Sequence, residues 1–414
     1  MKKNLPIGNA QYINHLNKVK VLNLIKESNE ISRAELVAQS HLSAPTITRI
    51  VDSLINNEKL AIQVGLGNSH GGRRPKMIKF NGDNNYIIGV DWGRTHIHGI
   101  LTNLHGHTLA ELDVKTEVIF NTSAQLNEVY DLIDQLISES NIDKTKLFGI
   151  GVAVAGFVNK DTNLIEYSPN FKWKNINLGL PIMKRFNVPV IIDNVSRVMA
   201  LGELHYGIGS QFKNYVFVNV GYGIGCGIIV NGAPLYGFDG ISGEIGHTKV
   251  MTNETSKRIC SCGKSDCLEC YSSGRGIAEI AAENIHSRQD SILFQEYQKS
   301  NITAEIVAKA ALADDQFALE LYHQAALYLG SAIANLANTI NPECIILGGK
   351  VAGAGKFFFS KILESFEREK LQQPSRTIQL LPTKLGHNAA AKGAIALILN
   401  EILNLNVKSI FSNT

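Results

Sequence analysis

Apolar residues recur at helical spacing in the first 60 residues of the chain. Over 16–26 they stand about every three positions, at Leu16, Val19, Leu22 and Ile25, which predicts one apolar stripe along a helix. A second helix is predicted to open at Ser32, because Glu35 follows three residues later and completes a capping-box pattern.

A third helix is predicted over 44–57, with Ser43 as its cap and Pro45 in its first turn, where proline is tolerated. Its apolar positions Ile47, Ile50 and Leu54 should face inward. Two helices joined by a short turn at 41–42 are typical of a helix-turn-helix, whose second helix enters the major groove. The predicted DNA contacts on these helices are Ser32, Arg33, Ser43, Thr46, Thr48 and Arg49.

Two extended runs within 59–80 flank a glycine-rich tip and predict a wing. Gly71 and Gly72 give a flexible turn, and Arg73 and Arg74 follow with two fixed positive charges. Such charges suit phosphates or the minor groove, so both arginines are predicted DNA contacts. A solvated loop is the alternative for these two residues.

The remainder of the chain alternates strand-like runs with helical patterns, which favours helices packed on sheets. Strands are expected within 86–106, 148–158, 188–194 and 215–232, and a buried helix over 326–340 leads to a strand that ends in Gly348–Gly349. The glycine-bearing strand turns and the late helix–strand–glycine unit indicate a two-lobed α/β body with a central cleft.

Composition narrows the class of protein. With 414 residues, 44% hydrophobic and 19% charged, the chain should form two to four globular domains, which excludes wholesale disorder and a coiled-coil rod. No run reaches the length of a transmembrane helix, and the first residues lack a secretory apolar core, so we expect a cytoplasmic protein without a membrane partner.

Charge is distributed unevenly along the chain. Residues 1–80 hold 12 Lys and Arg against 5 Asp and Glu, whereas the rest holds 28 against 32. A basic head on a mildly acidic body predicts that the head meets a polyanion. A solvated basic arm is the alternative.

Four of the six cysteines lie within 260–270, which suggests a metal in a reducing compartment. Cys260, Cys262 and Cys267 form a compact thiolate cluster, and tetrahedral zinc requires a fourth ligand. From the residues alone, Cys270 or His247 can supply it.

Several motifs resemble those of the ROK family of repressors and sugar kinases, and specifically its transcriptional repressors, over nearly the whole chain. The sequence GGRRP at 71–75 matches the repressor branch. Residues 91–106 and 221–232 resemble the family's two phosphate loops, and GEIGH with CSCGKSDCLE resembles its zinc signature.

The resemblance implies an α/β fold: an N-terminal winged helix-turn-helix followed by a two-lobed actin-like or sugar-kinase-like body. We expect a DNA-binding domain over 1–84, lobe I over 85–198 plus 386–414, and lobe II, with the zinc loop, over 199–385. The sugar would lie in the cleft between the lobes.

The resemblance also implies the site residues. A structural zinc would be held by His247, Cys260, Cys262 and Cys267, with Cys270 as a spare thiol; Asp266 stands where the family usually has glycine. The implied sugar contacts are Asn170, Asn194, Glu244, His247 and Glu269. His247 would bind zinc through one ring nitrogen and face the sugar with the other.

The features needed for phosphate transfer are altered. Val195 occupies the place of the family's catalytic aspartate and cannot accept a proton, and Asp193 lies roughly 6–7 Å further back along a strand. Arg94 and Tyr222 replace a glycine and a small hydroxyl residue in the phosphate loops, and His387 stands where kinases often have aspartate. We therefore expect no catalytic residue, while residual nucleotide binding remains an alternative.

The sequence thus predicts a sugar-responsive DNA-binding repressor of carbohydrate-utilisation genes, released from operator DNA by a sugar or sugar phosphate. We expect a dimer or a tetramer, because operator sites of this kind have two-fold symmetry. One alternative is an ATP-dependent ROK-type sugar kinase that keeps a DNA-binding head. Another is a zinc-stabilised sugar sensor that acts through a protein partner.

Overall fold

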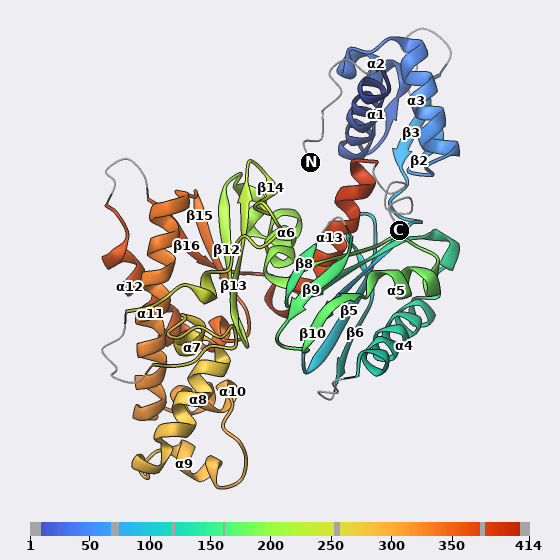
Figure 1. Cartoon of the computed structure of the whole chain (residues 1–414). Helices are drawn as coiled ribbons and strands as arrows, with labels where there is room; N and C mark the ends of the chain where they lie inside the picture. Colours follow the sequence, from blue (N-terminus) through green and yellow to red (C-terminus); the bar gives the residue numbers. More distant parts are fainter. Residues whose placement is uncertain are drawn as a thin grey trace.

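The computed structural model describes residues 10–67, 74–116, 121–159, 162–251, 257–372 and 377–405. They form a small head and a larger body of two lobes, which confirms the predicted fold class (Figure 1). Gly71, Gly72, Arg73 and the final segment 406–414 lie outside the described residues. The predicted domain boundaries therefore stay a prediction.

The head is a winged helix-turn-helix. Its elements are α1 (Ala10–Glu27), β1 (Ile31–Ser32), α2 (Arg33–Ser40), α3 (Ala44–Asn56), β2 (Ala61–Leu66) and β3 (Lys76–Phe80). The three strands form one sheet in the order β1-β3-β2. The predicted capping box is present, because Ser32 Oγ accepts from Glu35 N and Glu35 Oε2 accepts from Ser32 N.

The apolar pattern of the head is borne out on α3 and only in part on α1. Ile47, Ile50 and Leu54 are buried, as their spacing predicts. Leu16 is 48% exposed, however, because the part of α1 that enters the core begins at Val21.

Lobe I is built on a five-stranded sheet in the order β11-β7-β4-β5-β6. The helices α4 and α5 cover one face of this sheet, and a small sheet β10-β9-β8 lies beside it (Figure 1). Its elements are β4 (Tyr86–Trp92), β5 (His96–Asn103), β6 (Thr108–Lys115), α4 (Thr122–Ser140), β7 (Leu147–Val154), β8 (Phe157–Asn159), β9 (Leu164–Ser168), β10 (Trp173–Asn177), α5 (Gly179–Phe186) and β11 (Val190–Asn194).

Lobe II carries a second five-stranded sheet, β14-β13-β12-β15-β16. Its strands are β12 (Tyr215–Val220), β13 (Ile224–Val230), β14 (Ala233–Pro234), β15 (Cys344–Gly348) and β16 (Gln379–Pro382). The helices of this half are α6 (Val195–Tyr206), α7 (Glu269–Ser272), α8 (Gly274–Asn284), α9 (Ile292–Tyr297), α10 (Ala304–Leu312), α11 (Gln316–Ile340) and α12 (Lys356–Glu369).

Successive side chains of β12 belong to two different cores, so this sheet is buried on both faces. Val216 and Val218 belong to the core formed with α11 and α12, whereas Tyr215 and Phe217 pack toward α6. Successive side chains of a strand point to opposite faces, so each set meets a different layer.

The last helix, α13 (Ala389–Leu403), joins the parts of the molecule. It packs on the face of the lobe I sheet opposite α4 and crosses α6 at close range: a Cβ at Gly393 would lie 1.9 Å from the Val198 carbonyl oxygen. Its outer residues Ile395 and Ile402 share one buried cluster with Val21 and Leu22 of the head. Figure 1 shows α13 running from between the lobes toward α1.

In the ranges that the structure describes, no helix combines the length and the apolar character needed to cross a bilayer.

Candidate functional site

A cleft lies between the loops at the ends of the two large sheets. Lobe I contributes the turn after β4 and the end of β11, and lobe II contributes the β12–β13 turn and the segment 244–269. All five residues predicted to contact sugar line this cleft: Asn170, Asn194, Glu244, His247 and Glu269. The structure therefore brings together side chains that are separated by up to 99 positions in sequence.

Glu244 lies half-buried in the cleft. Burial raises the pKa of its carboxyl to about 7, although the Arg197 guanidinium opposes this shift. Its place is fixed by two glycines that lie against β13: a Cβ at Gly243 would be 2.0 Å from the Cys226 carbonyl oxygen, and one at Gly246 would be 2.1 Å from that of Ile224. Among the described residues no group donates a hydrogen bond to this carboxylate, which leaves it available to a ligand.

Glu269 is held more firmly. Its Oε1 lies 3.2 Å from an Arg275 nitrogen, and its Oε2 accepts from Ile224 N at 3.1 Å. The carboxylate therefore ties α7 to the β12–β13 turn while one edge still faces the cleft.

Asn194 also has a structural task. Its Oδ1 caps α6 by accepting from Ser196 N at 2.9 Å, and its Nδ2 donates to the Gly156 carbonyl at 2.9 Å. A capping oxygen satisfies helix N–H groups that would otherwise lack partners. Only part of the carboxamide is thus left for a ligand in the cleft.

Asn170 stands on a loop anchored by aromatic packing. The ring of Phe171 stacks on Trp173 with centroids 4.1 Å apart, and Trp92 contacts Trp173 edge-on at 5.2 Å. These buried rings fix the backbone that follows Asn170, which lines the cleft.

Asp193, two residues before Val195, is already paired. Asp193 forms a buried ion pair with Arg197, with its Oδ1 2.6 Å from the guanidinium Nη2, and the Tyr236 hydroxyl donates to its Oδ2 at 3.1 Å. Val195 follows at the start of α6 and lines the cleft. Asp193 is thus held away from the role that Val195 cannot perform.

The two substituted phosphate-loop residues contact each other across the cleft. Arg94 Nη1 donates to the Tyr222 hydroxyl at 2.5 Å, and the guanidinium carbon lies 5.0 Å from the centre of the tyrosine ring. Arg94 follows β4 of lobe I and Tyr222 follows β12 of lobe II. The pair therefore bridges the lobes at the two loops that resemble the family's phosphate loops.

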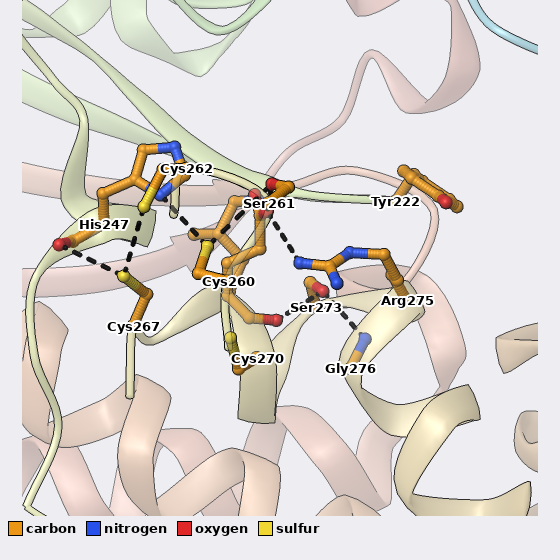
Figure 2. Close-up of polar contacts among 12 residues, drawn as sticks. Tyr222, His247, Cys260, Ser261, Cys262, Cys267, Cys270, Ser273, Arg275 and Gly276 are labelled. Carbon is orange, nitrogen blue, oxygen red and sulfur yellow. Dashed lines mark hydrogen bonds and ion pairs between the residues drawn. The ribbon is translucent and has the colours of Figure 1, made fainter. Parts of the chain in front are cut away.

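A compact group of one histidine and three cysteines lies beside the cleft. The potential ligand atoms of His247, Cys260, Cys262 and Cys267 are all within 4.8 Å of one another. His247 Nδ1 is 3.6 Å from Cys260 Sγ, and the sulfurs of Cys262 and Cys267 are 3.7 Å apart (Figure 2).

These distances fit a tetrahedral metal site. Ligands at about 2.0–2.3 Å from a zinc ion are separated from one another by about 3.6–3.8 Å. Burial raises the pKa of the Cys267 thiol, and neighbouring thiols add to the effect, so a cation would favour the thiolate that this environment disfavours. The cluster could hold a metal ion.

The neighbouring residues define the loop without entering the cluster. Cys270 is buried, with its Sγ 4.0 Å from the Arg258 carbonyl oxygen, and it is absent from the four-residue group. Asp266, in the place of a family glycine, has φ +58°. Its Oδ1 accepts from Arg258 N at 3.1 Å and from the Tyr271 hydroxyl at 3.0 Å, which secures the left-handed turn.

The predicted DNA contacts occupy different environments. Ser43, Thr48, Arg49 and Arg74 are exposed, and Thr46 is half-buried. Arg49 donates to Asn14 Oδ1 at 2.8 Å, and Arg33 pairs with Asp52 at 2.8 Å. Ser32 is buried as the cap of α2, so it does not fit the exposed contact expected for it.

Sequence reasoning missed Arg197 and Arg275, which position the carboxylates of Asp193 and Glu269. Arg197 follows Asp193 by four residues. This spacing indicates an ion pair only weakly, because Asp193 lies near the end of a strand and Arg197 near the start of a helix. Arg275 carries a comparable signal six residues after Glu269.

Comparison with known proteins shows which family the chain belongs to. The chain is 29% identical over 398 residues to the xylose repressor of Caldicellulosiruptor bescii, covering 96% of this chain and 99% of that protein. It is 35% identical over 309 residues to a glucokinase of Halalkalibacterium halodurans, covering 74% of this chain and 93% of the enzyme.

Among solved structures, a ROK family transcriptional regulator, a homolog of the E. coli MLC protein, matches with a TM-score of 0.80 and 26% identity, covering 96% of this chain and 99% of that one. The family model described as ROK matches residues 87–401, which is most of the body and three quarters of the chain. The chain therefore belongs to the ROK family.

Proposed function

We propose that this protein is a sugar-responsive DNA-binding repressor of carbohydrate-utilisation genes, and that a sugar bound in the cleft releases it from its operator. The observation that carries the proposal is the position of α13. This helix packs against α6 between the lobes and shares a buried core with α1 of the head. A change in lobe closure would therefore reach the DNA-binding helices through packed side chains.

Recognition of the sugar rests on the polar residues of the cleft. Glu244 offers a half-buried carboxylate without a donor among the described groups, and Glu269 and Asn170 lie on the same cleft. Vicinal hydroxyls would supply the missing hydrogen bonds. A carboxylate removed from water without a hydrogen-bond donor costs free energy. A sugar hydroxyl that donates to it would therefore contribute more to binding than one that replaces an existing hydrogen bond.

The metal cluster would hold a structural zinc. His247, Cys260, Cys262 and Cys267 give a closed set of four ligands with no open position for catalysis. With Nδ1 directed at the sulfurs, the Nε2 of His247 is left for the cleft that His247 also lines. Bound zinc would fix the segment that carries Glu244 and Glu269.

We further propose that the cleft does not transfer phosphate. Val195 cannot act as a base, Asp193 is committed to Arg197, and the Arg94–Tyr222 contact closes the space between the phosphate loops. An ATP-dependent sugar kinase is the second candidate function, favoured by the 35% identity of the body to a glucokinase.

Release of DNA follows from differential binding. A sugar that binds one lobe arrangement better than the other shifts the population toward it. The DNA-bound head would favour the other arrangement. Operator DNA must then weaken sugar binding by the same factor by which the sugar weakens DNA binding. Binding to palindromic DNA as a homodimer or tetramer would repeat this coupling in each chain.

The DNA contacts are proposed on the exposed side of α3 and on the wing: Ser43, Thr46, Thr48, Arg49, Arg73 and Arg74, with Arg33 at the edge of α2. Arg49→Ala should weaken specific binding by about 1–3 kcal/mol if its guanidinium reads a base. An equal loss on random DNA would make Arg49 a phosphate contact.

The function is tested by selecting genomic fragments that bind the purified protein and then titrating each complex with a panel of sugars and sugar phosphates. The proposal expects one class of operator and at least one ligand that releases it. Failure to select any specific sequence, or phosphorylation of a sugar by ATP, would contradict it.

A further inference from the structure

We propose that the chain has a second metal site, which takes a divalent transition ion such as Zn²⁺, formed by His98, Glu111 and His387. The three side chains come from β5, from β6 and from the short 3-10 turn Gly386–Asn388, so they are brought together only by the fold. Their potential ligand atoms all lie within 4.8 Å of one another.

The separations suit nitrogen and oxygen ligands of one ion. His98 Nε2 lies 3.1 Å from Glu111 Oε1, and His387 Nε2 lies 3.5 Å from the same oxygen. Ligands about 2.0–2.2 Å from zinc would be about 3.3–3.6 Å apart in a tetrahedron. Small movements of exposed side chains would therefore complete the geometry.

The three residues differ in exposure in a way that suits a site entered from solvent. The His98 side chain is 7% exposed and is fixed within the sheet, whereas the side chains of Glu111 and His387 are 37% and 67% exposed. The buried His98 ring also has a nitrogen, Nδ1, without a hydrogen-bond partner among the described residues. A cation would therefore bind through Nε2, the ring nitrogen that faces Glu111.

Two further carboxyl groups lie beside His98 in the sheet. His98 is paired in register with Asp113 of β6 on one side and with Asp91 of β4 on the other. Residues opposite each other in antiparallel strands place their side chains on one face. A cation at His98 would thus lie on a face that also carries two carboxyl groups.

The position of this site would affect how the two lobes are connected. The turn that carries His387 lies between β16 of lobe II and α13, which packs on lobe I and on the head. An ion shared by β5, β6 and this turn would fasten the start of α13 to lobe I. Metal occupancy would then restrain the segment that connects the two lobes.

This site is chemically distinct from the thiolate cluster. It offers two imidazoles and one carboxylate and no sulfur, so it should bind its ion more weakly and more reversibly. The inference does not depend on the sugar or on DNA, and it can be tested on the full chain alone.

The test is a Co²⁺ titration of the full-length protein whose thiolate cluster has first been saturated with Zn²⁺. We expect one further Co²⁺ per chain by calorimetry, with the weak visible bands of nitrogen and oxygen ligation and without sulfur-to-cobalt charge transfer. Both His387→Ala and Glu111→Gln should lower the affinity by at least about tenfold.

His323→Ala is the matched control, because it removes a partly exposed histidine from α11 in the other lobe. It should leave the affinity unchanged. His387 is largely exposed, so its loss should not affect folding, and circular dichroism will show whether it does. Absence of a further Co²⁺, equal binding by the His387 variant, or a thiolate spectrum would each overturn the proposal.

Discussion

The two ends of the cleft differ in what they present to a ligand. At the sugar end, Glu244 and Glu269 face the cleft from lobe II and Asn170 faces it from lobe I. At the end where phosphate transfer would occur, Arg94 contacts Tyr222, and Val195 occupies the position proposed for the catalytic base, although valine cannot accept a proton. On the proposed function, one end would recognise sugar hydroxyls, while the other would lack the bare backbone and the base that phosphate transfer requires.

The difference teaches that closure and catalysis can be separated within one fold. Closure needs only that a ligand contact both lobes, which the sugar end allows. Catalysis needs a base and an open phosphate site in addition. A protein that keeps the first and loses the second can report the presence of a sugar without consuming it.

The largest effect is expected from removing a ligand of the metal cluster. Cys262→Ser should abolish zinc binding at the thiolate cluster and the response to sugar, since structural zinc contributes on the order of 10 kcal/mol in small sites. Elemental analysis after purification in metal-free buffer measures the first effect, and operator release measures the second.

Cys270→Ser is the matched control for this change, because Cys270 is buried nearby but lies outside the four-residue group. It should retain one zinc per chain. Loss of zinc in this variant together with its retention in His247→Ala would show that Cys270 is the fourth ligand.

The next largest effect concerns the sugar end. Glu244→Ala should weaken sugar binding by about 1.5–3 kcal/mol, the contribution of hydrogen bonds to a charged group. DNA affinity should stay nearly intact, so the variant should behave as a super-repressor. Fluorescence anisotropy of labelled operator with increasing sugar measures both quantities.

Glu320→Ala is the control for this variant. Glu320 lies on α11, is about half exposed and pairs with Arg288 outside the cleft. Release of operator at the same sugar concentration by wild type and by both variants would remove Glu244 from the account.

The smallest effect is expected at the phosphate end. Val195→Asp should not create an efficient kinase, because Arg94 and Tyr222 still occupy the phosphate loops. A coupled ADP assay should detect little or no turnover with any sugar. Rapid turnover in this single variant would show that the phosphate end is intact apart from its base.

Features set by neighbouring residues could be predicted from sequence. The capping box at Ser32 and Glu35 depends on four consecutive residues, and the thiolate cluster depends on one short loop. The family resemblance supplied His247 and the sugar residues, and the structure gathers them at one cleft.

Contacts between distant segments could not be predicted in this way. Arg94 and Tyr222 are 128 positions apart, and nothing in either loop indicates that they meet. Asn194 was expected to face the sugar, yet its side chain also caps α6, because a residue at a strand end often begins the next helix. Leu16 fits the apolar spacing of α1, yet its side chain is about half exposed because it lies beyond the end of the core.

The most direct test of the account is one titration that follows operator binding and ATP consumption in the same sample. Labelled operator, the protein and ATP are mixed, and candidate sugars are added while anisotropy and ADP are recorded. We predict that the cognate sugar lowers operator affinity by about 5–150-fold, that operator lowers sugar affinity by the same factor, and that no sugar-dependent ADP forms. Sugar-dependent ADP production, or a sugar that binds tightly and leaves operator affinity unchanged, would contradict the account.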